Sequence, residues 1–232
     1  MADTVFLLDV DNTLLDNDAV VEDLRRHLIT AFGEGFERHY WEIFEELRRE
    51  LGYADYLGAL QRFRIEHPRD PHLLEVSLFL LAYPFADRVY PGAFDAIRRL
   101  ASRGLVVILS DGDVVFQPRK VERSGLGRAV GGRVLIYVHK EQELADVERF
   151  YPADHYVLID DKVRILTAVK QAWGSRVTTI FVRQGHYAHD PAVLAEYPPA
   201  DQSVAAIGDL LHLDPHVLLE AGTAGGTTGR II

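Results

Sequence analysis

The placement of apolar runs along the chain constrains its fold more than any other feature. Residues 4–8 form one short apolar run with polar or charged residues on both sides. From residue 91 onward, further short apolar runs alternate with segments of helical periodicity, a pattern typical of a parallel sheet with helices on both faces. Residues 4–8 fit a strand buried on both faces and most simply belong to the same sheet.

The alternation predicts five strands and the helices between them. Helical periodicity that ends at a glycine, as in residues 94–104, marks the connecting segments. After residue 185 the signals weaken to a short helix near 192–196, a strand around Val204, and helices near Leu210 and Val217. The predicted strands are residues 4–8, 105–109, 134–138, 156–159 and 177–182, and the later helices are 119–123, 141–150 and 163–173.

Between the first strand and residue 89 the pattern is helical throughout. Apolar residues recur at helical spacing in four segments, and Gly33 and Gly52 follow the first two. The fourth segment is apolar almost all round, which predicts a central position among the four helices. The four segments are residues 20–32, 36–51, 53–66 and 70–82.

These patterns predict an α/β fold, a Rossmann-like doubly wound parallel sheet with an inserted all-helical domain. We expect the α/β domain to comprise residues 1–16 and 89–220, and the helical domain to comprise residues 17–88. The last segment, 221–232, is rich in glycine and threonine and has no apolar periodicity, so we expect a disordered tail there.

Composition excludes several classes of function. The 232 residues include no cysteine, which rules out disulfides, thiolate zinc sites and cysteine nucleophiles. A formal net charge of −10 argues against nucleic acid as a partner. The first apolar run lacks a preceding basic segment, and no run of about 18 apolar residues occurs. We therefore expect a cytoplasmic protein without a membrane partner.

Polar side chains gather where the predicted strands end. In an open parallel sheet, the carboxyl ends of the strands form the crevice that binds ligands. Each group alone has a simple structural explanation, as a turn, a helix N-cap or a solvated lysine. Their occurrence at four successive strand ends is better explained by one shared site. The residues are Asp9 and Asp11 after the first strand, Ser110, Asp111 and Gly112 after the second, His139 and Lys140 after the third, and Asp160 and Asp161 after the fourth.

The chemistry of these residue types points to phosphoryl transfer. Clustered carboxylates repel one another and need a cation, and oxygen ligands without cysteine or paired histidine favour Mg²⁺ over zinc. Asp9 can act as a nucleophile, and Asp11 can protonate the leaving oxygen and later deprotonate water. Ser110 and the backbone N–H groups that follow it can hold phosphate oxygens, while Lys140 balances charge in the transition state.

On these residues the chain resembles the haloacid dehalogenase (HAD) superfamily of hydrolases, and within it the phosphatases with a C1-type helical cap. Residues 9–16 are similar to the family's first motif, and Ser110, Lys140 and the pair Asp160-Asp161 to the second, third and fourth. The resemblance implies a cap at residues 17–88 that opens and closes over the crevice. It implies catalytic roles for Asp9, Asp11 and Lys140, phosphate binding by Ser110, Asp111, Gly112 and Lys140, and Mg²⁺ binding by Asp9, Asp160, Asp161 and the backbone carbonyl of Asp11.

Two positions leave alternatives open. The second motif of the family often continues with asparagine, whereas Asp111 follows Ser110 here, so backbone amides can hold the phosphate with the Asp111 side chain facing elsewhere. Lys120 is a rival for the third-motif lysine. We prefer Lys140, because it stands directly at a strand end whereas Lys120 lies within a predicted helix.

The function predicted from these residues is hydrolysis of a small phosphorylated metabolite by a Mg²⁺-dependent phosphomonoesterase that forms an aspartyl-phosphate on Asp9. Three alternatives are a metal-free dehalogenase, a phosphomutase and a non-catalytic binding module. Asp11 argues against the dehalogenase, because displacement of halide needs no proton for the leaving group. The pattern leaves the physiological substrate and the oligomeric state open, including a homodimer.

Overall fold

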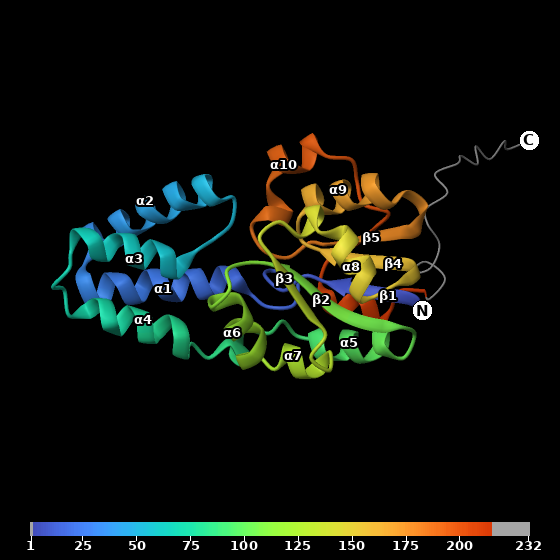
Figure 1. Ribbon diagram of the computed structural model, residues 1–232, viewed down its shortest axis with the longest axis horizontal. Helices are drawn as coiled ribbons and strands as arrows, with labels where there is room; N and C mark the ends of the chain where they lie inside the picture. The colour runs from blue at the N-terminus through green and yellow to red at the C-terminus, as the bar shows by residue number, and fades with distance from the viewer. Residues whose placement is uncertain (1, 215–232) are drawn as a thin grey trace, which may run out of the picture.

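The computed structural model describes residues 2–214, and a sheet of six parallel strands lies at its centre (Figure 1). Its spatial order is β3-β2-β1-β4-β5-β6, so the first strand of the chain is central. The predicted α/β fold class is confirmed, whereas the expected tail at 221–232 and the helix near Val217 lie outside the described residues. The strands are β1 (Ala2–Leu8), β2 (Leu105–Asp111), β3 (Val134–Tyr137), β4 (Ala153–Asp160), β5 (Val177–Val182) and β6 (Gln202–Val204).

Alternate side chains of β1 enter two different apolar cores, one on each face of the sheet. Phe6 and Leu8 join a core with residues of α5 (Ala93–Ala101) and α6 (Phe116–Arg123). Val5 and Leu7 join the opposite core, which includes residues of α8 (Leu144–Phe150) and α9 (Val163–Trp173). All four of these β1 side chains are fully buried, which explains why the strand is a continuous apolar run.

After β1 the chain forms four helices, α1 to α4, before it returns to the sheet, and we call these four the helical insertion (Figure 1). They extend away from the sheet as a bundle. Each predicted helix is present, with ends that differ from the predicted ones by a few residues. The helices are α1 (Asn17–Phe32), α2 (Glu34–Leu51), α3 (Tyr56–Glu66) and α4 (His72–Ala82).

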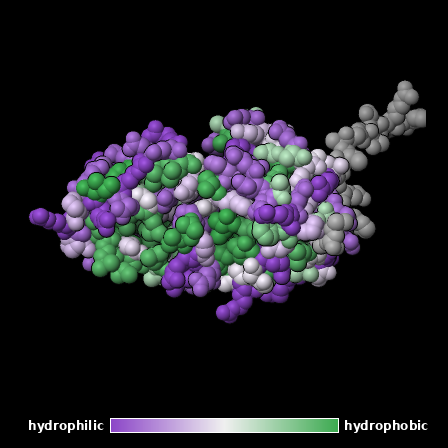
Figure 2. Space-filling view, in the orientation of Figure 1, coloured by the Kyte–Doolittle hydropathy of each residue, from purple (hydrophilic) through white to green (hydrophobic). Residues whose placement is uncertain are grey.

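The expected central position of α4 is wrong. Leu74 and Leu78, one helical turn apart, are 66% and 56% exposed, so α4 turns one apolar face outward. Figure 2 shows hydrophobic residues gathered on the lower side of the helical insertion, where α4 lies. Leu73, Val76 and Leu80 form its buried face. Among the described residues, no helix combines the length and the apolar character needed to cross a membrane.

The chain enters and leaves the helical insertion at neighbouring points. The backbone N–H of Asp16 donates to the carbonyl of Arg88 at 2.8 Å, and the N–H of Tyr90 donates to the carbonyl of Leu14 at 2.9 Å. Asp16 also caps α1, because its carboxylate accepts a hydrogen bond from the backbone N–H of Ala19 at 2.9 Å. The segment that enters the helical insertion and the segment that leaves it are therefore joined by backbone hydrogen bonds.

Two helices differ from their predicted bounds. The helix predicted at 119–123 begins at Phe116, because the carboxylate of Asp113 accepts from the backbone N–H groups of Val115 and Phe116 and starts the first turn. The helix predicted at 141–150 is divided into a 3₁₀ turn, η2 (Lys140–Gln142), and α8. The remaining elements are α7 (Leu126–Ala129), α10 (Pro191–Glu196) and the 3₁₀ turns η1 (Phe85–Arg88), η3 (Gly174–Arg176), η4 (Tyr187–His189) and η5 (Ile207–Leu211).

Candidate active site

The polar residues predicted to share a site follow the carboxyl ends of adjacent strands. Asp9 follows β1, Ser110 is the residue before the last of β2, and Asp160 ends β4. Leu8 of β1 stands beside Ile108 of β2 on one side and Ile159 of β4 on the other. Because these strands are parallel neighbours, the residues that follow them are brought to one edge of the sheet.

Lys140 joins two of the carboxylates. Its Nζ lies 2.5 Å from Oδ1 of Asp9 and 2.6 Å from Oδ2 of Asp160, and it also donates to the carbonyl of Leu109 at 3.3 Å. The side chain is 1% exposed. Burial disfavours the charged amine, but the carboxylates of Asp160 and Asp9 more than offset this and raise the pKa of Lys140 well above its usual value. Lys140 is therefore a fixed positive charge beside Asp9.

Asp9, Asp160 and Asp161 form a buried cluster of carboxylates. One oxygen from each lies within 4.8 Å of the others. Among the described residues, Oδ2 of Asp9 and both carboxylate oxygens of Asp161 have no hydrogen-bond partner. Burial raises the pKa of both Asp160 and Asp161, although Lys140 and Lys162 oppose the shift. Three converging carboxylates, with free oxygens on Asp9 and Asp161, fit a hard divalent cation such as Mg²⁺.

Ser110 and Gln117 form a polar pair at the end of β2. The side-chain amide of Gln117 donates to Oγ of Ser110 at 2.9 Å, and both residues are buried. Gly112 lies against the same glutamine, since a Cβ atom at this position would stand 2.5 Å from Cβ of Gln117. The close approach requires a glycine, and it brings the backbone after Ser110 against the start of α6.

The carboxylate of Asp111 faces the loop that carries Lys140. Its Oδ1 accepts a hydrogen bond from the backbone N–H of Lys140 at 2.8 Å. Burial raises the pKa of Asp111, and the positive charge of Lys140 opposes the shift. This bond ties the first residue of η2 to the last residue of β2.

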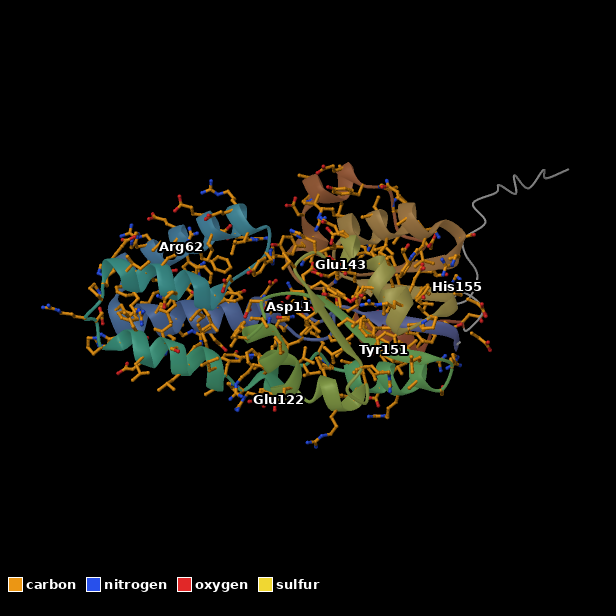
Figure 3. All side chains as sticks on the ribbon, viewed as in Figure 1. Asp11, Arg62, Glu122, Glu143, Tyr151 and His155 are labelled. Carbon is orange, nitrogen blue, oxygen red and sulfur yellow. The ribbon has the colours of Figure 1, made fainter. Side chains whose placement is uncertain are left out.

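Asp11 lies where the helical insertion meets the sheet (Figure 3). Its Oδ1 is 2.6 Å from Nζ of Lys120, which comes from α6 and is fully buried. The two lysines that the sequence offered as rivals therefore both belong to the site, Lys140 beside Asp9 and Lys120 beside Asp11. Next to Asp11, Asn12 has a positive φ of 59° and its side-chain carbonyl accepts the backbone N–H of Asn17 at 3.0 Å.

A cavity of about 540 Å³ opens between these residues and the helical insertion. Asp11, Asp111 and Lys162 line it from the side of the sheet. The insertion supplies aromatic side chains on the other side, namely Trp41, Phe44, Tyr53 and Tyr56. Arg62 lies on the outer part of the insertion, where it pairs with Glu50 at 2.5 Å, and is not among the residues that line the cavity (Figure 3).

Sequence reasoning missed several residues that the structure brings to the cavity. Lys162 directly follows Asp160-Asp161, and its pKa is raised because Asp161 and other carboxylates outweigh the opposing effect of burial. Its position after the acidic pair was the available signal. Arg48 of α2 donates to the hydroxyl of Tyr187 in η4, so the insertion and the sheet side also meet across the cavity. Residues so distant in the sequence leave no pattern that predicts their contact.

A family model described as haloacid dehalogenase-like hydrolase matches residues 4–172. A protein from Burkholderia xenovorans LB400 described as a haloacid dehalogenase-like hydrolase is 64% identical, with a TM-score of 0.88 over 91% of this chain and 99% of that one. None of the curated proteins compared with the sequence matches it.

Two more distant structures show the same fold. The HAD-hydrolase YfnB from Bacillus subtilis, bound to magnesium, is 16% identical with a TM-score of 0.60 over 90% of this chain and 97% of its own. L-2-haloacid dehalogenase from Xanthobacter autotrophicus is 18% identical with a TM-score of 0.58 over 91% of this chain and 98% of its own. The family model and the 64% identical relative show that the chain belongs to the haloacid dehalogenase-like hydrolases.

Proposed function

We propose that this hydrolase cleaves phosphate monoesters of small metabolites in a Mg²⁺-dependent reaction, through an aspartyl-phosphate on Asp9. The observation that carries the proposal is the pairing of two aspartates, Asp9 and Asp11, each with its own buried lysine. Asp9 is buried beside Lys140, and Asp11 stands at the cavity beside Lys120. A nucleophile and a separate proton donor are the two groups that ester cleavage needs.

In the first step, a carboxylate oxygen of Asp9 attacks phosphorus, and the bond between phosphorus and the ester oxygen breaks. Asp11 gives its proton to the departing oxygen, which leaves as an alcohol. Lys140, within 2.5 Å of Asp9, offsets the negative charge that gathers around the transferring group. We assign the hydroxyl of Ser110 and the backbone N–H of Asp111 to the phosphate oxygens, whereas the backbone N–H of Gly112 donates to the carbonyl of Tyr137 at 2.9 Å and is not available for them.

In the second step, water attacks phosphorus of the aspartyl-phosphate. Asp11, now a carboxylate, takes the proton from this water, and the bond between phosphorus and Asp9 breaks to release inorganic phosphate. Both side chains return to their starting protonation states. The same residue thus serves as acid and then as base, which requires it to face the bond that breaks and the water that attacks.

Asp9, Asp160, Asp161 and the backbone carbonyl of Asp11 would hold Mg²⁺. The ion, when bound, supplies positive charge that lets an anionic substrate approach this carboxylate cluster. The helical insertion would act as a cap of the C1 type, because Trp41, Tyr53 and Tyr56 face the sheet-side residues across the cavity. Closure of such a cap excludes water from the reacting groups.

Dehalogenation is the second candidate, because the fold is shared with L-2-haloacid dehalogenase. At 18% identity this likeness concerns the fold alone. Carbon–halogen displacement needs a carboxylate nucleophile but no proton donor. It therefore gives no chemical role to Asp11 or to Lys120, its buried partner. A phosphomutase would use the same first step and return the phosphoryl group to an organic acceptor.

The test is to incubate the purified protein with p-nitrophenyl phosphate and, separately, with 2-chloropropionate, with Mg²⁺ or with chelator. We expect phosphate release that requires Mg²⁺ and is lost in Asp9→Asn, without chloride release. Chloride release that is insensitive to chelator would support the dehalogenase instead. Full phosphatase activity in Asp9→Asn would overturn the aspartyl-phosphate. A panel of phosphorylated metabolites would then identify the substrate class.

A further inference from the structure

Lys120 is a buried cation whose position is tied to one carboxylate. It lies in α6, is 0% exposed, and its Nζ is 2.6 Å from Oδ1 of Asp11. A buried ammonium group is costly unless it is paired and hydrogen-bonded. Nζ of Lys120 donates hydrogen bonds to Oδ1 of Asp11 at 2.6 Å and to Oδ1 of Asn17 at 2.9 Å. The lysine is therefore held on two sides.

The contact of Lys120 with Asn17 connects the aspartate to the start of the helical insertion. Asn17 is the first residue of α1, and its side-chain amide donates to the hydroxyl of Tyr56 in α3 at 3.4 Å. Its backbone N–H donates to the side chain of Asn12, which directly follows Asp11. Lys120 thus stands where the strand-end loop, α6 and the insertion meet, and its amine is a common point of attachment for Asp11 and Asn17.

Asp11 has few other fixed contacts. Its side chain is 26% exposed and lines the cavity, in contrast to the buried side chain of Asp9, which is 4% exposed. A partly exposed aspartate would sample several rotamers without a fixed partner, and misplacement of a reacting group by about 1 Å can cost about 100-fold in rate. Nζ of Lys120 is the group that restricts the Asp11 carboxylate to one direction.

We propose that Lys120 is a positioning residue for Asp11, holding its carboxyl group toward the bond between phosphorus and the leaving group. The inference rests on the proposed phosphatase function and adds a residue to its machinery. Lys120 touches no reacting atom in this arrangement. Its effect must therefore appear only in steps that depend on proton transfer by Asp11.

The dependence of the rate on the leaving group separates this role from general support of the fold. Phenol is a poor leaving group that needs a proton, whereas 2,4-dinitrophenol leaves readily as an anion. In Lys120→Met we expect kcat/KM for phenyl phosphate to fall by about 10- to 100-fold and kcat/KM for 2,4-dinitrophenyl phosphate to change by less than about 3-fold. An equal loss with both substrates would overturn the proposal.

Lys170→Met is the matched control. Lys170 also pairs with one aspartate, since its Nζ lies 2.7 Å from Oδ2 of Asp201, and it bonds to the carbonyl of Val177 at the opposite end of β5 from the site. We expect this variant to treat the two substrates alike. A leaving-group effect in Lys170→Met as large as that in Lys120→Met would count against the proposal.

Two further variants keep the test decisive if Lys120→Met does not fold. Lys120→Arg retains the cation but moves its donor atoms, so it should show the same leaving-group effect to a smaller degree; equal rates for both substrates relative to wild type would overturn the proposal. In an Asp11→Asn background, Lys120→Arg should cause no further loss, because the group it positions is absent. A further loss there would show that Lys120 acts on something else.

Measurements on the wild-type protein distinguish a failure of the proposed function from a failure of the role assigned to Lys120. If wild-type protein releases phosphate from neither ester, the proposed function fails and the role of Lys120 fails with it. If wild-type protein is active and the two substrates respond equally to Lys120→Met, only the role of Lys120 fails. The result that supports both is an active wild type with a selective loss on phenyl phosphate.

Discussion

Nζ of Lys140 lies 2.5 Å from Oδ1 of Asp9, with both side chains buried. Replacement of Lys140 by methionine keeps the volume and removes the charge. We expect phosphate release to fall by at least about 100-fold, because the transition state loses its fixed positive charge. The free energy of unfolding in chelator should fall by about 3–5 kcal/mol, because the carboxylates of Asp9 and Asp160 would be left buried without their partner.

Steady-state kinetics and denaturant unfolding measure these two effects of Lys140→Met. Lys170→Met removes a more exposed lysine of α9, which pairs with Asp201 and bonds to the carbonyl of Val177 at the far end of β5, and it should leave the kinetics within about 2-fold of wild type. An active Lys140→Met variant with near wild-type kcat would contradict the role assigned to this lysine.

Stabilisation by Mg²⁺ should increase with pH. Burial raises the pKa of Asp160 and Asp161 in the folded chain above the unfolded value of about 3.9. Their contribution to stability is therefore fully present below that value and is lost as the pH rises through the folded-state pKa values. A divalent cation favours the ionised form and restores this loss, while at low pH it must compete with protons.

Thermal unfolding with Mg²⁺ or with chelator, at several pH values from 5 to 8, measures this linkage. We expect the increase in Tm caused by Mg²⁺ to be small at pH 5 and larger at pH 8. An increase in Tm that is the same at pH 5 and pH 8, or larger at pH 5, would contradict a metal site built from Asp160 and Asp161.

Asp161→Asn should separate metal binding from folding. Both carboxylate oxygens of Asp161 lack a hydrogen-bond partner among the described residues, and the side chain is buried. Without metal, the neutral amide avoids burial of a charge, so we expect a Tm equal to or above that of wild type. With Mg²⁺, the increase in Tm should be largely lost and activity should fall by more than about 10-fold.

Asp154→Asn is the matched control for Asp161→Asn, because Asp154 is an exposed aspartate of the same strand, β4. It should keep both the activity and the response to Mg²⁺. If Asp161→Asn instead responds to Mg²⁺ as wild type does, Asp161 is not a ligand.

Gly112→Ala should disturb the end of β2. The added Cβ would lie 2.5 Å from Cβ of Gln117, whose side chain bonds to Ser110. The clash must be relieved by movement of backbone, so we expect a loss of about 1–3 kcal/mol in the free energy of unfolding and a higher KM. Circular dichroism during denaturation and steady-state kinetics measure the two effects.

Gly35→Ala is the control for this substitution. Nothing lies within 4 Å of a Cβ atom at Gly35, which is in α2, so alanine should leave activity unchanged and raise helix stability slightly. Unchanged stability and kinetics in Gly112→Ala would show that the backbone after Ser110 does not depend on this close approach.

The parts of the fold that follow from local pattern could be predicted from the sequence. Periodicity placed α9 at Val163–Trp173 and β5 at Val177–Val182, which are also their observed bounds. The strand-end aspartates followed from the same pattern, because parallel strands present their carboxyl ends at one edge. The outward face of α4 was not predicted, because apolar character alone does not show which face of a helix finds a partner.

The contact between Lys120 and Asp11 is a part of the site that local sequence pattern could not predict. Strand-end position favoured Lys140 and gave no reason to include Lys120, which lies within a helix. The side chain of Lys120 reaches Asp11 and Asn17 only because tertiary packing places α6 beside the loop that follows β1. A contact between residues 109 positions apart depends on tertiary packing, which periodicity does not report.

The hydrogen bond between Asp16 and Arg88 means that the helical insertion begins and ends at one place. In topological terms, the bundle is an insertion whose two ends, at Asp16 and Arg88, lie side by side. Its length and sequence can therefore change during evolution without any change in the order or register of the strands. If the insertion acts as the proposed cap, selectivity for the organic part of a substrate can diversify while the residues at the strand ends stay as they are.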